Sequence, residues 1–357
     1  MLGPGGSAAM VERGRRRARV VPEEPKRTRA ADVAAIAGVS ESAVSRTFRD
    51  GSVSAHVRQR VLAAARELGY RPNAMAQALL TRRSNVIAIL MTTNTNSHFP
   101  EVLSALSHAA DAHRMRVMLF TVDDPLQVSD VVDQILSYQV DGVLSLTEVP
   151  AADARILESQ GVELVLYNRA RADYAANLVS CDHRAAGRVL GEHLLALGHR
   201  DFAMVEGPQR SSLALDRAQG VYDALAEAGI ERRAVPVAIG DFGYESGRAG
   251  ASALLSGKAK VTALVCVSDV MAIGAIDEAS SRGLHVPDDL SVAGFDGVPA
   301  GTWDRYRLTT MRQPLPQLAD AAIETIVRKL ANPTRARETR LLVCDLQIGA
   351  STKARAG

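Results

Sequence analysis

The polar side chains between Ser40 and Arg46 have the types and the spacing needed to recognise the edges of nucleic-acid bases. Val44 and Phe48 lie four residues apart, so in a helix they share one apolar face. Arginine is the commonest specific reader of guanine, through its O6 and N7 atoms. We therefore interpret Arg46 as a base-reading residue, and a merely solvated helix face is the alternative interpretation. The outward residues of this helix are Glu41, Ser42, Ser45, Arg46 and Arg49.

Two short helices joined by a tight turn must position this face. The apolar spacing of Val33, Ala34 and Ala37 predicts a first helix that ends at Gly38. Glycine supplies the positive φ of a sharp turn, and Ser40 can cap the second helix by accepting a backbone N–H. A third helix is expected between Ser54 and Gly69. Helices in this arrangement are typical of helix-turn-helix heads, whose second helix enters the major groove.

The segments DVAxxAGVSxxxVSR (32–46) and VSxxxRxRVLxAxxELGYRPNxxAxxL (53–79) resemble the head and hinge of the LacI-type bacterial transcription regulators. The resemblance implies a hinge helix at 74–80 that folds when two copies meet in the minor groove. Leu79 would insert between base steps there, and a packed hinge leucine is the alternative. The predicted DNA-binding set is Ser40, Glu41, Ser42, Ser45, Arg46, Asn73, Ala76 and Leu79.

The head departs from the family pattern at its start and on its reading helix. Relatives place a capping Thr where this chain has Arg29, and Thr28 lies one residue earlier, so we expect a shifted or weaker cap. Glu41 and Ser42 fill the positions that vary among relatives. The DNA sequence recognised is therefore not transferable from any relative.

Charge divides the chain into a basic head and an acidic body. Residues 1–83 hold 16 Lys/Arg against 7 Asp/Glu, and the remainder holds 26 against 33. A basic end favours polyanion binding, because phosphate contacts supply much of the affinity for DNA. Residues 1–27 are expected to form a disordered basic arm, with Met10 as an alternative start, and lack an apolar run long enough for a signal peptide or membrane span. A cytoplasmic protein is expected.

Beyond Arg83, short apolar runs alternate with amphipathic helical patterns. Repeated alternation of this kind predicts an α/β fold of parallel sheets with helices on both faces, and two sheets fit the length better than one. Strands are expected at 86–91, 116–121, 142–146, 163–167, 202–206, 263–267 and 291–295. Helices are expected at 101–113, 127–138, 185–197, 215–227, 247–255, 270–281 and 317–330.

The body also resembles the periplasmic-binding-protein-like domain of the same family, in phrases such as GEHLLALGH, SDVMAIGAIDEA and LTTMRQP. The resemblance implies two lobes with three crossings of the chain between them. Lobe 1 is expected at about 85–182 and 312–338, and lobe 2 at about 183–311 and 339–351. The head is expected at 28–72, the hinge and linker at 73–84, and a tail at 352–357.

Ligands of open α/β sheets bind beyond the carboxyl ends of the strands, so the cleft between two lobes is the expected site. Asp296 follows an apolar strand and can accept hydrogen bonds from ligand hydroxyls, as the family's acid does. Arg217 offers a planar fork of donors, and pairing with a surface acid such as Asp216 is the alternative. Relatives place a stacking aromatic at Phe242. The predicted effector-binding set is His98, Phe99, Asn168, Arg217, Phe242, Ser268 and Asp296, and for His98 and Phe99 helix-start packing is the alternative.

The sequence argues against a metal site, a cofactor and catalysis. Cys181, Cys266 and Cys344 lie far apart without CxxC spacing and are expected to be buried small hydrophobes. Nucleotide-binding glycine motifs, a GxSxG motif and paired catalytic acids are missing.

The favoured function is a homodimeric, sequence-specific transcription regulator, most simply a repressor, that binds a palindromic operator. A small polar effector such as a sugar or another polyol would control it allosterically from between the two lobes. A solute-binding protein for transport shares the body's fold but would need a signal peptide and has no use for the head. The C-terminal segment shows no heptad extension, which favours a dimer over a tetramer.

Overall fold

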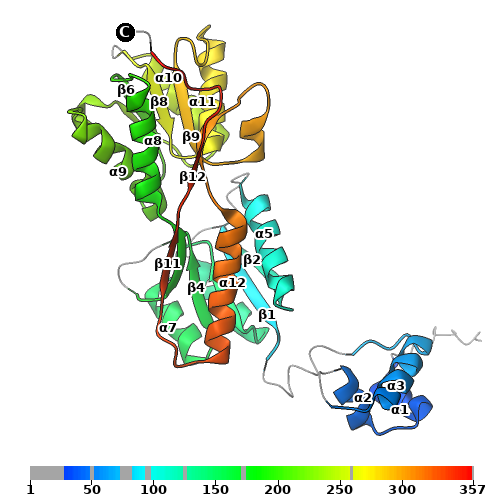
Figure 1. Ribbon diagram of the computed structural model, residues 1–357. Coiled ribbons are helices and arrows are strands. Elements are labelled where there is room, and N and C mark those ends of the chain that lie inside the picture. The colour runs from blue at the N-terminus through cyan, green and yellow to red at the C-terminus, as the bar shows by residue number, and fades with distance from the viewer. Residues whose placement is uncertain are drawn as a thin grey trace, which may run out of the picture. The chain divides into compact units, whose positions relative to one another are not determined.

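The computed structural model forms two compact units, a head within residues 1–77 and a body within residues 78–357. Figure 1 shows the helical head and the α/β body. The structure describes residues 28–48, 52–72, 83–92, 98–123, 127–169, 174–257 and 260–355.

The described residues of the head form the helices α1 (Ala30–Ala37), α2 (Glu41–Phe48) and α3 (Ala55–Glu67) around one small core. Val33, Val44 and Val61, one from each helix, are fully buried at its centre. Gly38 has φ 60° and ends α1, and Ser54 accepts a hydrogen bond from the Val57 N–H (3.3 Å) at the start of α3. The predicted helix-turn-helix is confirmed.

The N-terminus of α1 is not capped by a threonine side chain. Arg29 occupies the cap position, and the Asp32 carboxylate accepts a hydrogen bond from its backbone N–H at 2.8 Å. The Thr28 hydroxyl instead donates to the Leu68 carbonyl at 3.1 Å. Thr28 therefore ties the start of the head to the end of α3 rather than capping α1.

The first lobe is a parallel six-stranded sheet in the order β11-β5-β4-β3-β1-β2. Side chains on β1, which lies between β3 and β2, alternate between the two faces of the sheet: Ile87 and Ile89 pack beneath α5 and α12, and Ala88 and Leu90 beneath α6 and α7. The strands are β1 (Val86–Thr92), β2 (Arg116–Val122), β3 (Gly142–Ser145), β4 (Glu163–Tyr167), β5 (Asn177–Cys181) and β11 (Thr339–Leu342). The helices are α5 (Phe99–Ala112), α6 (Val128–Ser137), α7 (Ala151–Ser159) and α12 (Leu315–Ala331).

The second lobe is a six-stranded sheet in the order β12-β10-β9-β8-β6-β7, with β12 antiparallel to β10 and the other pairs parallel. Helices α8 and α9 pack together, as do α10 and α11. The strands are β6 (Phe202–Glu206), β7 (Val237–Ile239), β8 (Ala263–Cys266), β9 (Ser291–Asp296), β10 (Thr309–Arg312) and β12 (Asp345–Gln347). The helices are α8 (His183–Ala196), α9 (Ser212–Glu227), α10 (Tyr244–Leu255) and α11 (Asp269–Ser281), with short 3₁₀ turns at Arg232–Ala234 and Pro299–Thr302.

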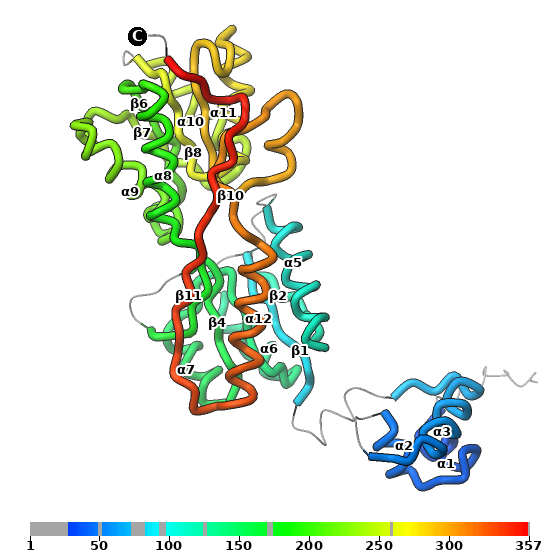
Figure 2. The backbone as a smooth tube through the Cα atoms, viewed as in Figure 1, coloured from blue at the N-terminus to red at the C-terminus, as the bar shows by residue number. Residues whose placement is uncertain are grey.

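The chain passes between the lobes three times, after β5, after β10 and after β11 (Figure 2). The lobe boundary expected near residue 338 is too early, because β11 still pairs with β5 in the first sheet and only β12 joins the second. The third crossing therefore lies between β11 and β12. The expectation of wholly parallel sheets also fails at β12, which reaches its sheet directly from β11 without a crossover helix.

All seven expected strands and all seven expected helices of the body are present, with ends shifted by a few residues. The apolar pattern of the sequence did not predict α7 (Ala151–Ser159) or the strands β5, β7, β10, β11 and β12. Four of these strands have three or four residues, and β7 and β11 expose several side chains at a sheet edge. Their apolar patterns are therefore too short or too mixed to distinguish from loops.

Cys181, Cys266 and Cys344 are buried and free, as expected for small hydrophobes. A search of the described residues finds no group of three potential metal ligands. Of the helices within the ranges given above, none is long and apolar enough to cross a membrane.

Candidate functional site

The predicted base-reading residues form the open face of α2. Ser40, Glu41, Ser42 and Arg46 are exposed and Ser45 is half-buried. The Ser40 hydroxyl accepts a hydrogen bond from the Ala43 N–H at 3.3 Å, and it lies 2.8 Å from the Ser42 hydroxyl. Ser40 therefore acts as the helix cap that its position predicts. Asn73, Ala76 and Leu79 lie outside the described residues.

The opposite face of α2 holds the helix against the head. Ala43, Val44 and Thr47 are buried, and Phe48 is half-buried with its ring 5.8 Å from that of Tyr70. The Thr47 hydroxyl is satisfied by donating to the Ala43 carbonyl at 2.9 Å. This packing leaves the polar residues of α2 available for a partner.

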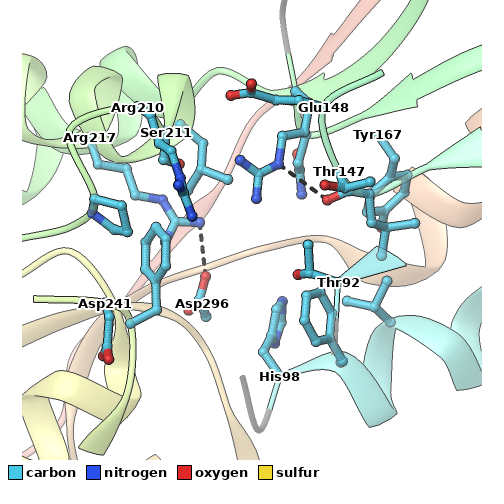
Figure 3. A pocket seen from close by; sticks show the side chains of 18 of the residues that line it. Thr92, His98, Thr147, Glu148, Tyr167, Arg210, Ser211, Arg217, Asp241 and Asp296 are labelled. Atoms are coloured by element: carbon cyan, nitrogen blue, oxygen red, sulfur yellow. Dashed lines mark hydrogen bonds and ion pairs between the residues drawn. The ribbon is translucent and has the colours of Figure 1, made fainter. Parts of the chain in front are cut away.

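A second candidate site is a cavity of about 520 Å³ between the two lobes of the body (Figure 3). Its polar lining includes Asn168 after β4, Asp296 at the end of β9 and Gln313 after β10. These residues meet because the carboxyl ends of the parallel strands of both lobes face the same space. The cavity volume lies in the range typical of sites for small molecules.

A chain of hydrogen bonds crosses this cavity from one lobe to the other. The Arg217 guanidinium forms an ion pair with Asp296 Oδ1 at 2.8 Å, and both side chains are buried. Gln313 Nε2 donates to the same Oδ1 at 2.8 Å, and Gln313 Oε1 accepts from Asn168 Nδ2 at 2.7 Å. Asn168, Gln313 and Asp296 thus couple β4 of the first lobe to β9 of the second.

Arg217 is held on several sides by the second lobe. Besides Asp296, it donates to the Val267 carbonyl at 2.8 Å and to His183 Nδ1 at 3.3 Å. The expected alternative, a surface pair with Asp216, is wrong because Arg217 turns inward. Burial, together with the positive charges of Arg217 and Arg169, lowers the pKa of His183 well below its usual value. His183 is therefore neutral and accepts at Nδ1.

Some buried polar atoms of the lining have no hydrogen-bond partner among the described residues. They include Asp296 Oδ2, Ser211 Oγ and Tyr167 Oη. Burial raises the pKa of the Tyr167 phenol, so its hydroxyl keeps its proton. An unpaired buried polar group costs about 1 to 3 kcal/mol, which a ligand that pairs with it would recover.

Strained backbone conformations also occur in the lining of this cavity. Asn168 (φ 53°), Phe242 (φ 72°) and Asp296 (φ 118°) all have positive φ, and all three line the cavity. Asparagine tolerates the left-handed region, but phenylalanine rarely enters it. Strain of this kind persists where the surroundings hold a side chain in one direction, and it is common at ligand sites.

His98 and Phe99 line the cavity from the start of α5. His98 is buried, with Nε2 3.2 Å from Gln313 Nε2. Burial lowers the pKa of His98 even though the Asp296 carboxylate opposes that shift. The neutral ring can then accept from the Gln313 amide.

Ser268 is the one predicted effector residue that the structure places elsewhere. It is fully buried, caps α11 by accepting from the Met271 N–H at 3.3 Å, and donates to the Phe242 carbonyl at 3.4 Å. It is not among the described residues that line the cavity. Its hydroxyl instead supports the strained backbone of Phe242, which is a structural role.

Sequence reasoning missed Gln313, Ser211 and Tyr167 at the cavity. Gln313 stands directly after LTTMR, and recognising that run as strand β10 would have placed it with the other residues that follow strands. Ser211 precedes a strong helical pattern and could have been noticed as a cap. Tyr167 is the last residue of β4 and gave no distinguishing signal, because a strand-end tyrosine is equally suited to the core.

Two family models match the chain. Residues 31–73 match "Bacterial regulatory proteins, lacI family", and residues 192–352 match "Periplasmic binding protein-like domain". The first covers the helices of the head, and the second covers most of the second lobe together with parts of the first. The order of head and body is therefore reproduced by independent comparisons.

Whole-length relatives agree with these matches. The HTH-type transcriptional repressor CytR of Escherichia coli is 31% identical over 90% of this chain and 96% of its own length. The solved Lac repressor dimer bound to operator and the anti-inducer ONPF is 27% identical, with a TM-score of 0.82, and covers 92% of this chain and 100% of that chain. The transcriptional regulator CelR in complex with cellobiose is 27% identical, with a TM-score of 0.69, over 91% of this chain and 100% of that chain.

Proposed function

Because this chain belongs to the LacI family of bacterial regulatory proteins, we propose that it binds a palindromic operator as a homodimer under the control of a small polar effector. Family membership makes the chain a transcriptional repressor with a DNA-binding domain and an effector-binding domain, and not an enzyme. Beyond family membership, we propose the form of the DNA site, the dimer, the effector and the residues that contact each of them.

The exposed face of α2 supports the DNA-binding half of the proposal. A helix of this kind reads base edges in the major groove with the residues of its N-terminal turns. Arg46 would read guanine, while Ser40, Glu41, Ser42 and Ser45 would contact neighbouring bases or phosphates. Two heads related by two-fold symmetry require a roughly palindromic site. A related solved structure is a repressor dimer bound to operator.

The buried, unpartnered polar atoms around the Arg217–Asp296 pair carry the effector-binding half. An acceptor at Asp296 and hydroxyls at Ser211 and Tyr167 match a ligand rich in hydroxyl groups, such as a sugar. Phe242 offers an aromatic face for the apolar side of a sugar ring. The related regulator CelR was solved with cellobiose, which is a ligand of this chemistry.

Control of DNA binding would follow from the bonds that join the lobes. Asn168, Gln313 and Asp296 connect the two lobes directly, so a ligand that enters the cavity competes with or reinforces these bonds. The lobe arrangement that results would favour or disfavour pairing of the two hinges on DNA. Coupling energies of this kind are about 1 to 3 kcal/mol. A regulator of bacterial DNA acts in the cytoplasm, which is the proposed location.

Selection of bound sequences from a random DNA pool by the purified full-length protein tests the proposal. We expect enrichment of a palindrome at a stated, near-physiological salt concentration. Binding without enrichment, which weakens only as salt increases, would contradict a sequence-specific regulator. The enriched sequence then serves as the DNA for every effector experiment.

A further inference from the structure

Two arginines at the cavity have no acidic partner at ion-pair distance among the described residues. Arg169 follows β4, is only partly exposed, and donates from Nε to the Leu146 carbonyl at 3.2 Å. Arg210 stands just before α9 on the other lobe and is exposed. Their terminal guanidinium nitrogens therefore remain available to a ligand.

The lining holds three arginines and three acids, so its formal charges balance, but only Arg217 is paired with an acid at ion-pair distance among the described residues. Asp296 is already paired with Arg217, and the Asp241 carboxylate accepts from the Gly243 N–H at 2.8 Å. Burial lowers the pKa of Arg169; Glu148 opposes that shift, while Arg210 and Arg217 add to it. Glu148 and Asp241 form no ion pair with Arg169 or Arg210 among the described residues, so both guanidinium groups can pair with an anionic group of a ligand.

The N-terminus of α9 is a further feature of the cavity that favours a negatively charged ligand group. This 16-residue helix begins at Ser212, and the hydroxyl of its cap, Ser211, accepts no hydrogen bond from the first turn. Ser211 is 2% exposed, and its Oγ has no partner among the described residues. A helix N-terminus carries partial positive charge and unsatisfied N–H groups. Figure 3 shows Arg210 and Ser211 on the side of the cavity from which Arg217 also extends.

We propose that the effector is an anionic polyol, a sugar or sugar-like molecule that carries a phosphate or carboxylate group. The anionic group lies between Arg169, Arg210 and the N-terminus of α9 with Ser211. The hydroxyl groups meet Asp296 and Tyr167 at the other part of the same cavity. This inference rests on the proposed function, and it changes the ligand class from a neutral sugar to a charged one.

Calorimetric titration of the full-length protein with matched pairs of probes tests the charge requirement. The pairs are glucose with glucose 6-phosphate, ribose with ribose 5-phosphate, and glucose with gluconate; inorganic phosphate is titrated alone. We expect the anionic member of at least one pair to bind about tenfold or more tightly than its neutral partner, because hydrogen bonds to charged groups are the strong ones. Inorganic phosphate should compete with that member, which assigns the phosphate chemistry to the site.

Two single variants locate the anion. Arg169→Gln and Arg210→Gln should each reduce affinity for the anionic probe about tenfold and leave that of its neutral partner nearly unchanged. Arg155→Gln is the matched control, since Arg155 is exposed on α7 and does not line the cavity. Equal affinity for both members of every pair, failure of all anions to bind, or an unchanged preference in both variants would overturn the inference.

Two different measurements separate this inference from the proposed function. A neutral sugar that binds, depends on Asp296 and alters operator affinity would overturn the anionic class while the proposed function stands. Failure of the random-pool selection to enrich a palindrome would instead contradict the proposed function itself. The two failures are thus observed in different measurements.

Discussion

The polar residues of α2 in the head and those of the cavity in the body differ in their spacing along the chain and in their exposure. On α2 they follow one another within seven residues and are exposed. In the cavity they come from places between His98 and Gln313, and most are buried and bonded to each other. Substitution of an exposed residue of α2 such as Arg46 should therefore change recognition alone, whereas substitution of a buried, bonded residue of the cavity should change recognition and folding together.

The largest expected difference is at the buried ion pair. Asp296→Ala leaves Arg217 charged and unpaired in the interior, which should lower the free energy of unfolding of the body by about 3 to 5 kcal/mol. Trp303 is the single tryptophan and lies in the body, so its fluorescence during urea titration reports this unfolding.

The variants Arg46→Ala and Asp296→Asn serve as controls for the destabilisation expected of Asp296→Ala. Arg46→Ala should change the same unfolding curve by no more than about 0.5 kcal/mol, because the side chain is exposed in the other unit. Asp296→Asn keeps the shape of the side chain and should be less destabilising than Asp296→Ala. A body of unchanged stability in Asp296→Ala would show that the ion pair is not a structural link.

The second largest expected difference is in the response to mild acid, which should destabilise the body through its buried histidines. Burial lowers the pKa values of His183 and His98, so near pH 6 the unfolded chain binds more protons than the folded body. Each of these histidines should therefore make the body less stable as the pH falls below about 6.5, by up to about 1.4 kcal/mol per pH unit. Asp269 opposes part of this slope, because burial raises its pKa to about 8. Urea titrations followed by Trp303 between pH 7.5 and 5.5 measure this slope.

His183→Asn is the test of that assignment. Its amide oxygen can accept from Arg217 Nε in place of Nδ1, while the group no longer titrates. We expect a shallower slope in this variant. An identical slope would assign the acid sensitivity to other groups.

The smallest expected effect lies in the head. Ser40→Ala removes the cap of α2 and should cost about 1 kcal/mol, or about fivefold faster amide exchange in α2. Hydrogen exchange with mass spectrometry resolves the head from the body in the full-length protein. Ser42→Ala is the matched control, because Ser42 is exposed and does not cap. Slower or unchanged exchange in Ser40→Ala would contradict the capping role.

The contrast between the two regions also explains what the sequence could predict. The head lies in one segment, so apolar spacing, Gly38 and Ser40 were enough to place α2 and its outward residues. The cavity required strand ends to be aligned across two sheets. Residues after strong apolar strands, such as Asn168 and Asp296, were placed correctly for that reason.

Residues at weak or ambiguous elements were not found. Gln313 follows a four-residue strand, and only the fold shows that it joins the lobes. Ser268 also follows a strand, but its hydroxyl caps the next helix instead of facing the cavity. Gln313 and Ser268 are both polar residues that follow a strand, so the sequence gives the same signal for both. Only the direction of the side chain decides which of the two lines the cavity.

The most direct test of the central claim compares Arg46→Ala with the wild-type protein on the selected palindrome and on random DNA, at one fixed salt concentration. We expect a loss of about 1 to 3 kcal/mol on the palindrome and little change on random DNA, because base contacts carry specificity and phosphate contacts do not. Equal losses on both DNAs would show that Arg46 contacts phosphate only, and would contradict the assignment of α2 as the base-reading helix.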